Sequence, residues 1–100
     1  MFGTIATMKV KPGQEQALVA LMDKWWTERR PKVKGAISST MYRSVDNPSE
    51  IMMAVVFDNK ENYMANANDP EQDKWYQEMA ACFDGAPSWK DGDIILQHGP

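Results

Sequence analysis

The chain has 100 residues, one Cys, one His and a formal net charge of −3. One Cys excludes an intramolecular disulfide, and one Cys with one His excludes a zinc cluster of these ligands within one chain. The acidic balance argues against a nucleic-acid partner, although Arg29, Arg30, Lys32 and Lys34 form one dense basic cluster. The length predicts one domain over residues 1–100.

The distribution of apolar residues also bears on location. No uncharged stretch approaches the roughly 20 residues that a membrane-spanning helix needs. The first residues lack the basic and apolar regions of a signal peptide. We therefore expect a cytoplasmic protein with a reduced thiol and no membrane partner.

The first third of the chain reads as a strand and a helix. Apolar and polar residues alternate over 2–10, and one face carries Phe2, Thr4, Ala6, Met8 and Val10. A helix is predicted over 14–29, because apolar residues recur there with the 3.6-residue period, and Pro31 ends it. Trp25 and Trp26 are neighbours on this helix and point about 100° apart. We expect Trp26 to contact a loop or a partner subunit.

Two strands follow. Residues 35–44 alternate, with Ile37, Ser39, Met41 and Arg43 on one face and Ala36, Ser38, Thr40 and Tyr42 on the other. Residues 51–57 are apolar without interruption, which is typical of a strand that is covered on both faces.

The last part of the chain predicts two helical pieces and a strand. Asp58 with Glu61, and Asp69 with Gln72, have the spacing of a capping box, so the helical region 59–83 should break near 66–68. A loop over 85–92 carries Trp89, which we expect to plug the core, and a final strand is predicted at 93–98. Cys82 is expected to be a buried structural thiol and His98 to belong to the tail.

The order strand, helix, strand, strand, helix, strand predicts a ferredoxin-like α+β fold with an antiparallel four-stranded sheet. Two helices can cover only one face of that sheet. Since residues 51–57 indicate cover on both faces, the second face needs a cover from elsewhere. We therefore predict a homodimer in which the two sheets pack face to face.

Several segments resemble a known family. Phe2-Gly3-Thr4-Ile5-Ala6 followed by Val10-Lys11-Pro12-Gly13 is similar to the opening of the antibiotic biosynthesis monooxygenase domain. Val55-Val56-Phe57, followed by a helix that contains Tyr63, is similar to a later part of the same domain. The resemblance covers nearly the whole chain and is to small stand-alone members of the dimeric α/β barrel superfamily.

The resemblance implies a dimeric α/β barrel with a pocket between sheet and helices in each subunit. It also implies oxygenation of a small phenol, quinol or anthrone-like substrate without a metal or flavin cofactor. An aromatic diol anion can itself reduce dioxygen, so such a protein has to bind the ring, favour its deprotonated form and exclude water.

Some positions depart from the family pattern. Many quinol-oxidising members carry a His where this chain has Asn66, so no obvious general base is present. In the haem-degrading members, an Asn corresponds to Ala6 and a haem-ligating His falls near Trp75. The chain has no His before residue 98, which argues against haem ligation of that kind.

Five residues are candidates for lining the pocket and binding the substrate: Asn66, Trp75, Tyr76, Tyr63 and Arg43. Each also has a structural interpretation, as a turn residue, as core packing or as a solvated strand end. Two other functions stay open. The chain could be a non-catalytic dimeric barrel that binds a small hydrophobic or aromatic ligand, or an isomerase or lyase of the same superfamily.

Overall fold

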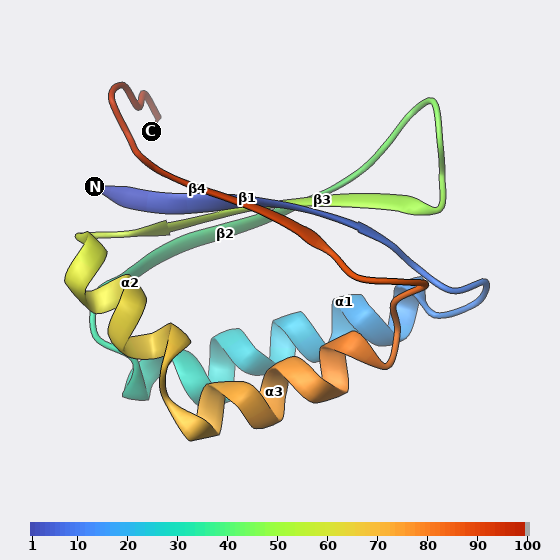
Figure 1. The fold of residues 1–100 in the computed structure, drawn as a ribbon, viewed down its shortest axis with the longest axis horizontal. Helices are drawn as coiled ribbons and strands as arrows, with labels where there is room; N and C mark the ends of the chain where they lie inside the picture. The colour runs from blue at the N-terminus through green and yellow to red at the C-terminus, as the bar shows by residue number, and fades with distance from the viewer. Residues whose placement is uncertain (100) are drawn as a thin grey trace.

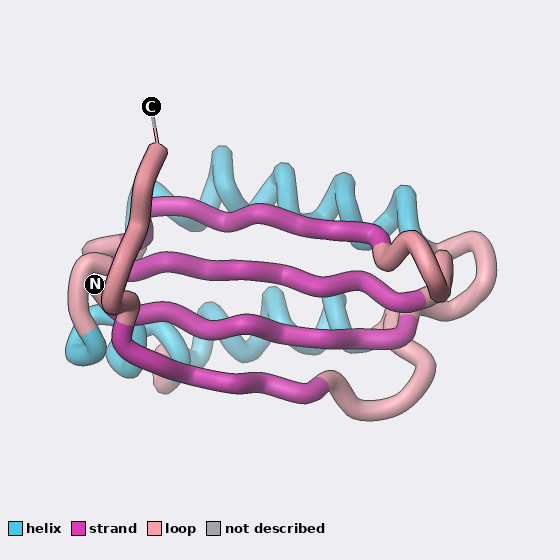
Figure 2. The backbone as a smooth tube through the Cα atoms, turned by 90° about the horizontal axis from the view of Figure 1, so that it is seen from above, coloured by secondary structure: helices cyan, strands magenta, loops and turns pink. Residues whose placement is uncertain are grey.

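Four antiparallel strands form one sheet with all three helices on one face (Figures 1 and 2). The structure is a computed structural model that describes residues 1–99. The strands follow the order β2-β3-β1-β4, which is the ferredoxin-like α+β fold that the order of elements predicts. Their bounds are β1 (Phe2–Lys9), β2 (Ala36–Arg43), β3 (Glu50–Phe57) and β4 (Ser88–Asp93), and the helices are α1 (Glu15–Lys24), α2 (Lys60–Ala67) and α3 (Pro70–Ala80).

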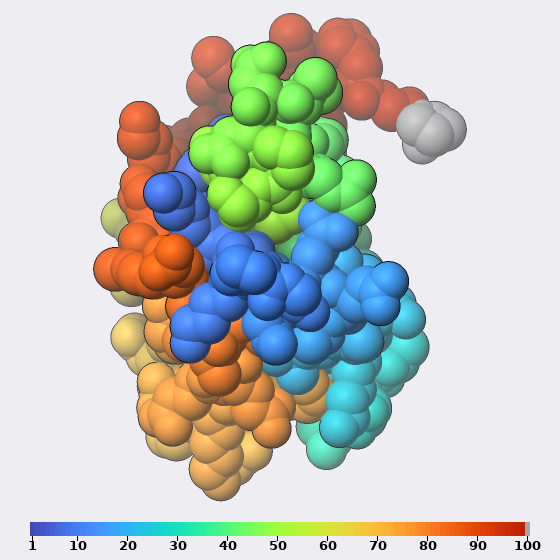
Figure 3. Space-filling model, turned by 90° about the vertical axis from the view of Figure 1, so that its right-hand side faces the viewer, coloured from blue at the N-terminus to red at the C-terminus, as the bar shows by residue number. Residues whose placement is uncertain are grey.

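The core lies between the sheet and the helices. Alternate residues of β1 are buried there, as their period-two pattern predicts, and α1 adds the fully buried Leu18. The other buried members include Ile51 and Met53 from β3, Met79 from α3, and Cys82. Figure 3 looks at the end of the molecule where α1 begins and shows α1 (blue to cyan) and α3 (orange) beneath the strands.

The helix that follows β1 changes its geometry near its end. After Lys24 the chain forms one π-helical turn, η1 (Trp25–Arg29), and then a 3-10 turn, η2 (Arg30–Lys32), that contains Pro31. The predicted extent of the helix is therefore close to the observed one, but the π turn was not predicted. Such turns are frequent at functional sites.

The break between α2 and α3 falls at Asn68 and Asp69, next to the predicted position. The Asp69 carboxylate accepts a hydrogen bond from the Glu71 N–H at 2.9 Å and caps α3. At α2 the prediction of Asp58 as the cap is wrong by one residue. The side chain of Asn59 accepts from the Asn62 N–H at 2.8 Å, because the chain stays extended through Asn59.

Alternation along β2 is interrupted near its start. Ala36 pairs with Phe57 and Ser39 pairs with Val55, with a register shift between them. Because Phe57 and Val55 share a face of β3, this bulge brings Ala36 and Ser39 to the same side. The prediction that they lie on opposite faces is wrong.

The last strand lies earlier in the chain than predicted. β4 covers Ser88–Asp93 and pairs with β1, so Trp89 is a strand residue opposite Ala6 and not a loop residue. All six residues of β4 are exposed. Residues 94–99 have no regular structure, and Ile95 and Leu96 there are 96% and 73% exposed. The prediction of a strand at 93–98 is wrong. The position of β4 is determined by its backbone hydrogen bonds with β1, and not by the burial of apolar side chains on which the prediction relied.

In the part of the chain that the structure describes, no helix covers the face of the sheet that points away from α1, α2 and α3 (Figure 1). Ile5 on β1 and Tyr42 on β2 are 60% and 54% exposed there, and Met52 and Ala54 of β3 lie between them. One chain therefore covers one face of the sheet, as predicted. Among the described residues, no helix has the length and apolar character needed to cross a lipid bilayer.

Candidate functional site

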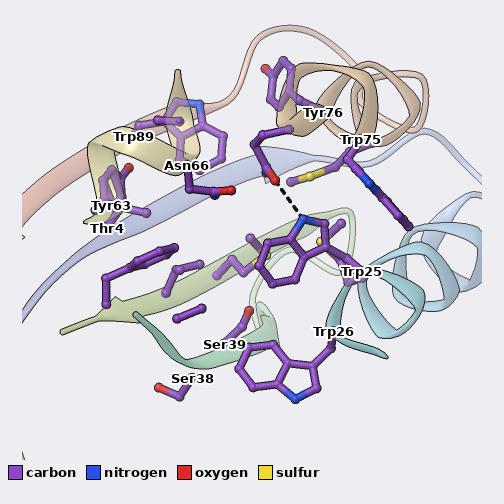
Figure 4. A pocket seen from close by; sticks show the side chains of 18 of the residues that line it. Thr4, Trp25, Trp26, Ser38, Ser39, Tyr63, Asn66, Trp75, Tyr76 and Trp89 are labelled. Carbon is purple, nitrogen blue, oxygen red and sulfur yellow. Dashed lines mark hydrogen bonds between the residues drawn. The ribbon is translucent and has the colours of Figure 1, made fainter. Parts of the chain in front are cut away.

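A cavity of about 360 Å³ lies between the sheet and the helices (Figure 4). Residues from all four strands, α1, η1, α2 and α3 line it. All four tryptophans of the chain are in its wall, and the aromatic lining consists of Trp25, Trp26, Phe57, Tyr63, Trp75, Tyr76 and Trp89. A lining of this kind suits a flat apolar molecule.

Four of the five residues that the sequence marks as candidates lie in this wall. α2 contributes Tyr63 and Asn66, and α3 contributes Trp75 and Tyr76. The break between α2 and α3 lets both helices present side chains to one cavity. These placements bring the four residues together but leave their roles as proposals.

Arg43 does not line the cavity, and the expectation that it does is wrong. It lies at the far end of β2, whereas the cavity reaches the beginning of that strand, at Ala36, Ser38 and Ser39. Its Nε and Nη2 donate to the two carboxylate oxygens of Glu15 at 2.6 and 2.7 Å. The hydrogen bond lowers the pKa of Glu15 and raises the pKa of Arg43.

Trp25 and Trp26 both reach the cavity wall (Figure 4), and the expectation that Trp26 also contacts a loop or a partner subunit stays a prediction. The wider π turn that begins at Trp25 alters the angle between neighbouring side chains. The Trp25 indole N–H donates to the Gln72 side-chain oxygen at 2.9 Å, which links η1 to α3. The Arg30 guanidinium carbon lies 4.6 Å from the centre of the Trp26 ring.

Trp89 lines the cavity from β4, next to Tyr76, with 6.2 Å between the ring centres. It therefore belongs to the wall and does not plug the core from a loop. Tyr63 lies on the same side of the cavity, edge-on to Phe2 and Phe57. Its hydroxyl donates to Asp91 Oδ1 at 3.0 Å. Burial raises the pKa of Tyr63, and the Asp91 carboxylate adds to the rise.

Asn66 is connected to a buried cation behind the wall. The Nη2 of Arg29 donates to Asn66 Oδ1 at 3.2 Å and to Asp69 Oδ2 at 3.1 Å. The backbone N–H of Glu71, and then Arg29, lower the pKa of Asp69. In the sequence, Arg29 is only one member of a basic cluster. Its position four residues after Trp25, on the same side of a helix, is the one signal that could have revealed it.

The wall of the cavity is nearly free of charge. Among the described residues Asp73 is the one charged side chain in it, and the Gln77 amide donates to this carboxylate at 2.8 Å. Neutral hydrogen-bonding groups come from Ser39, Asn66 and Tyr76. Within residues 1–99, no three His, Cys, Asp or Glu side chains gather in a way that could hold a metal ion.

Solved structures with this fold include a Bordetella bronchiseptica protein assigned to the antibiotic biosynthesis monooxygenases. It has a TM-score of 0.81 and 20% identity over 95% of this chain and 97% of that chain. SnoaB, a cofactor-independent oxygenase from Streptomyces nogalater, has a TM-score of 0.80 and 8% identity over 96% and 94%. Rv0793 from Mycobacterium tuberculosis has a TM-score of 0.77 and 17% identity over 98% of both chains. These likenesses show a shared fold.

The comparison by sequence is more specific. No curated protein matches the chain. The family model described as antibiotic biosynthesis monooxygenase matches residues 1–78, which include β1, α1, β2, β3, α2 and most of α3. The chain therefore belongs to the antibiotic biosynthesis monooxygenase family.

Proposed function

We propose that this protein is a monooxygenase that oxygenates a small phenol, quinol or anthrone in the cavity, without a metal or flavin cofactor. The observation that carries the proposal is the gathering of all four tryptophans around one cavity together with the Asn66 amide. Membership of a monooxygenase family and the shared fold of SnoaB, a cofactor-independent oxygenase, support it.

In this proposal the aromatic wall binds the substrate ring and excludes water from it. Trp25, Trp75 and Tyr76 are among the aromatic side chains of this wall, against which a planar ring can stack. Tyr63 has its hydroxyl proton directed to Asp91 and serves as a shaped apolar surface with a fixed orientation. Asn66 is the polar group that meets a substrate oxygen.

The substrate itself supplies the electrons. For an anthrone, loss of a proton from the ring CH₂ gives an anion, which transfers one electron to O₂. The resulting radical and superoxide combine through a new C–O bond. The peroxide takes up a proton, the O–O bond breaks, and the carbon loses its second hydrogen as a proton. One oxygen atom stays as the new C=O and the other leaves as water, so no external reductant is required.

The wall supplies neutral donors that favour the anion and one carboxylate that can accept the proton. A hydrogen bond from the Asn66 amide to the substrate oxygen stabilises negative charge as it forms there. Asp73 is the carboxylate in the wall, and we assign to it the acceptance of the first proton. This assignment replaces the His that related quinol oxidisers carry at the position of Asn66.

The assembly is part of the proposal. The uncovered sheet face, with Ile5, Tyr42, Met52 and Ala54, packs against the same face of a second copy, so that the protein is a homodimer that works in the cytoplasm. Burial of exposed apolar surface supplies the free energy of association.

A second candidate function is non-catalytic binding of a small aromatic molecule. None of the described residues that line the cavity is a His, which favours this function. A binding protein of this kind is stabilised against heat by its ligand but does not consume oxygen.

The proposal is tested by oxygen uptake with a panel of hydroquinones and anthrones. Wild type should consume O₂ faster than the buffer with at least one of them. Asn66→Ala should lower kcat by about 10²-fold, since one donor to the developing anion is lost. Asn68→Ala removes an exposed Asn outside the cavity and should leave the rate unchanged. Absence of uptake across the whole panel would rule out the oxygenase.

A further inference from the structure

We propose that Arg29 is a positioning residue that orients the Asn66 amide, so that its N–H₂ group and not its carbonyl oxygen binds the ligand. The inference rests on the proposed function, because it names the chemistry that meets the substrate oxygen in that cavity. An amide in this orientation should make the cavity bind ligands with a hydrogen-bond-accepting oxygen more tightly than ligands without one.

The position of Arg29 fits this role. Its side chain is 7% exposed, and it does not line the cavity but lies behind it. From η1, its Nη2 bridges Asn66 on α2 and Asp69 at the start of α3. Arg29 thus contacts both sides of the break between these helices. Its partner on α2 is Asn66, which together with Tyr63 provides the polar side chains of α2 that line the cavity.

The chemistry of the two groups determines the orientation of the amide. A guanidinium group only donates hydrogen bonds, whereas a carboxamide has one accepting oxygen and one donating nitrogen. The Asn66 atom that faces Arg29 must therefore be its oxygen. Among residues 1–99, the side-chain nitrogen of Asn66 makes no hydrogen bond, and the side chain is engaged only through its oxygen. Asn66 lines the cavity, so its two N–H donors are the part of the amide left for a ligand.

The buried charge also changes the strength of these donors. An amide whose oxygen accepts from a cation is polarised, and its N–H groups donate more strongly. The positive charge stays outside the cavity, where Asp69 balances it at 3.1 Å. The cavity can then accept a neutral ligand and still favour negative charge on its oxygen.

A further observation concerns the Nε of Arg29, which is buried without a hydrogen-bond partner among the described residues. A buried donor without a partner is unfavourable and rare in native proteins. The guanidinium group therefore leaves its Nε without an acceptor while its Nη2 donates to Asn66 and Asp69. This is expected if the two acceptors, and not satisfaction of every donor, determine the orientation of the group.

The test compares 1-tetralone with tetralin, which has a CH₂ group in place of the carbonyl group. 1-Tetralone has a carbonyl acceptor and no O–H or N–H donor. Quenching of the cavity tryptophans gives both dissociation constants, and wild type should bind 1-tetralone about tenfold more tightly, the effect of one hydrogen bond. Arg29→Met should remove this preference while binding tetralin as wild type does. Lys32→Met removes a charge from the same basic cluster and should leave the preference unchanged.

A double-mutant cycle separates positioning from packing. If Arg29 acts through Asn66, Asn66→Ala alone removes the preference, and adding Arg29→Met has no further effect on it. An equal loss of affinity for both ligands in Arg29→Met would show a merely structural role and overturn the inference. So would a wild type without any preference for 1-tetralone.

An experiment on wild type covers the case in which Arg29→Met does not fold. The side-chain NH₂ signals of Asn66 in ¹⁵N-labelled protein should shift when 1-tetralone is added and stay in place with tetralin. Unchanged signals with both saturating ligands would overturn the inference. Because these readouts measure binding, the inference and the oxygenase proposal can fail independently.

Discussion

The Asp69 carboxylate binds two neighbours from its position between α2 and α3. One of its oxygens accepts the Glu71 N–H, which caps α3, and the other accepts from Arg29, which in turn holds Asn66. Both partners favour the ionised carboxylate, so they lower the pKa of Asp69. A lowered pKa in the folded state means that this group stabilises the fold above its unfolded pKa, and that the stabilisation is lost as the pH falls through the folded value.

Thermal unfolding of Asp69→Asn against wild type measures this contribution. Asn still caps the helix, so the variant chiefly loses the charge. The difference in Tm should be largest near pH 7 and should shrink once the pH falls below about 4, the ordinary pKa of an Asp, because the unfolded chain then takes up a proton at this group before the folded state does. A difference that stays constant from pH 7 to pH 3 would contradict the assignment.

The two arginines show which part of the site the sequence can predict. Arg43 lies on a strand face with apolar neighbours, and that pattern suggested a cavity residue. The alternation along a strand predicts which face of the sheet a side chain is on, but not whether the cavity extends to that end of the strand. Arg43 is the last residue of β2, where it forms an ion pair with Glu15. Arg29 is part of a polar cluster in the sequence, and only the packing of η1 against the α2–α3 break buries it. Helical periodicity and the break signals place Tyr63, Asn66, Trp75 and Tyr76 on the two helices, and the family resemblance suggested a pocket for them to line.

At the scale of elements, the start of α2 depends on one side chain. Asn59 accepts from the Asn62 N–H, whereas Asp58 accepts from the Asn62 side chain and donates its backbone N–H to Gly35. Both residues are good caps by type, so spacing alone could not choose between them. The backbone hydrogen bond from Asp58 to Gly35, just before β2, keeps Asp58 in the extended segment, so that the helix begins one residue later.

Replacing the cap of α2 therefore has a definite expected cost. Asn59→Ala should lower the free energy of unfolding by about 1 kcal/mol, because the N–H groups of the first turn lose their acceptor. Asn68→Ala, at an exposed residue whose side chain caps nothing, provides the matched control and should cost clearly less. Urea unfolding gives both values, and equal losses would contradict Asn59 as the cap.

Two elements, β4 and η1, could not be predicted correctly from the sequence. β4 contains Lys90, Asp91, Gly92 and Asp93, which are poor strand formers, and its residues are all exposed. The apolar residues just beyond it attracted the strand prediction, although they make no strand in the chain. The π turn at η1 has no signature in periodicity, yet it places both Trp25 and Trp26 in the cavity wall.

For the whole molecule, the number of layers within one chain was predictable, and the proposed homodimer rests on it. Two helical regions could cover one face of a four-stranded sheet, and the structure leaves Ile5 and Tyr42 exposed on the other face. The order of strands followed from the order of elements, since few topologies connect them without crossings. The family resemblance implied a cavity between the sheet and the helices, but the lining of that cavity by all four tryptophans required the packed structure.

The homodimer is tested by the mass of the protein in solution. Wild type should have about twice the 11.4 kDa of one chain by light scattering. Ile5→Asp places a charge in the proposed interface and should give a monomer, because burying an unpaired charge is unfavourable. Val19→Asp, on an exposed position of α1, should stay dimeric. A folded wild-type monomer would contradict the face-to-face packing.

The proposed oxygenase must transfer one atom of O₂ to an aromatic substrate. Mass spectrometry of the product formed from an anthrone under ¹⁸O₂ in ordinary water measures this transfer, with Asn66→Ala and an enzyme-free sample alongside. Wild type should give a quinone with one ¹⁸O atom, formed faster than in either control. A quinone yield equal to that of the enzyme-free sample, or a new oxygen that comes from water, would contradict the proposal.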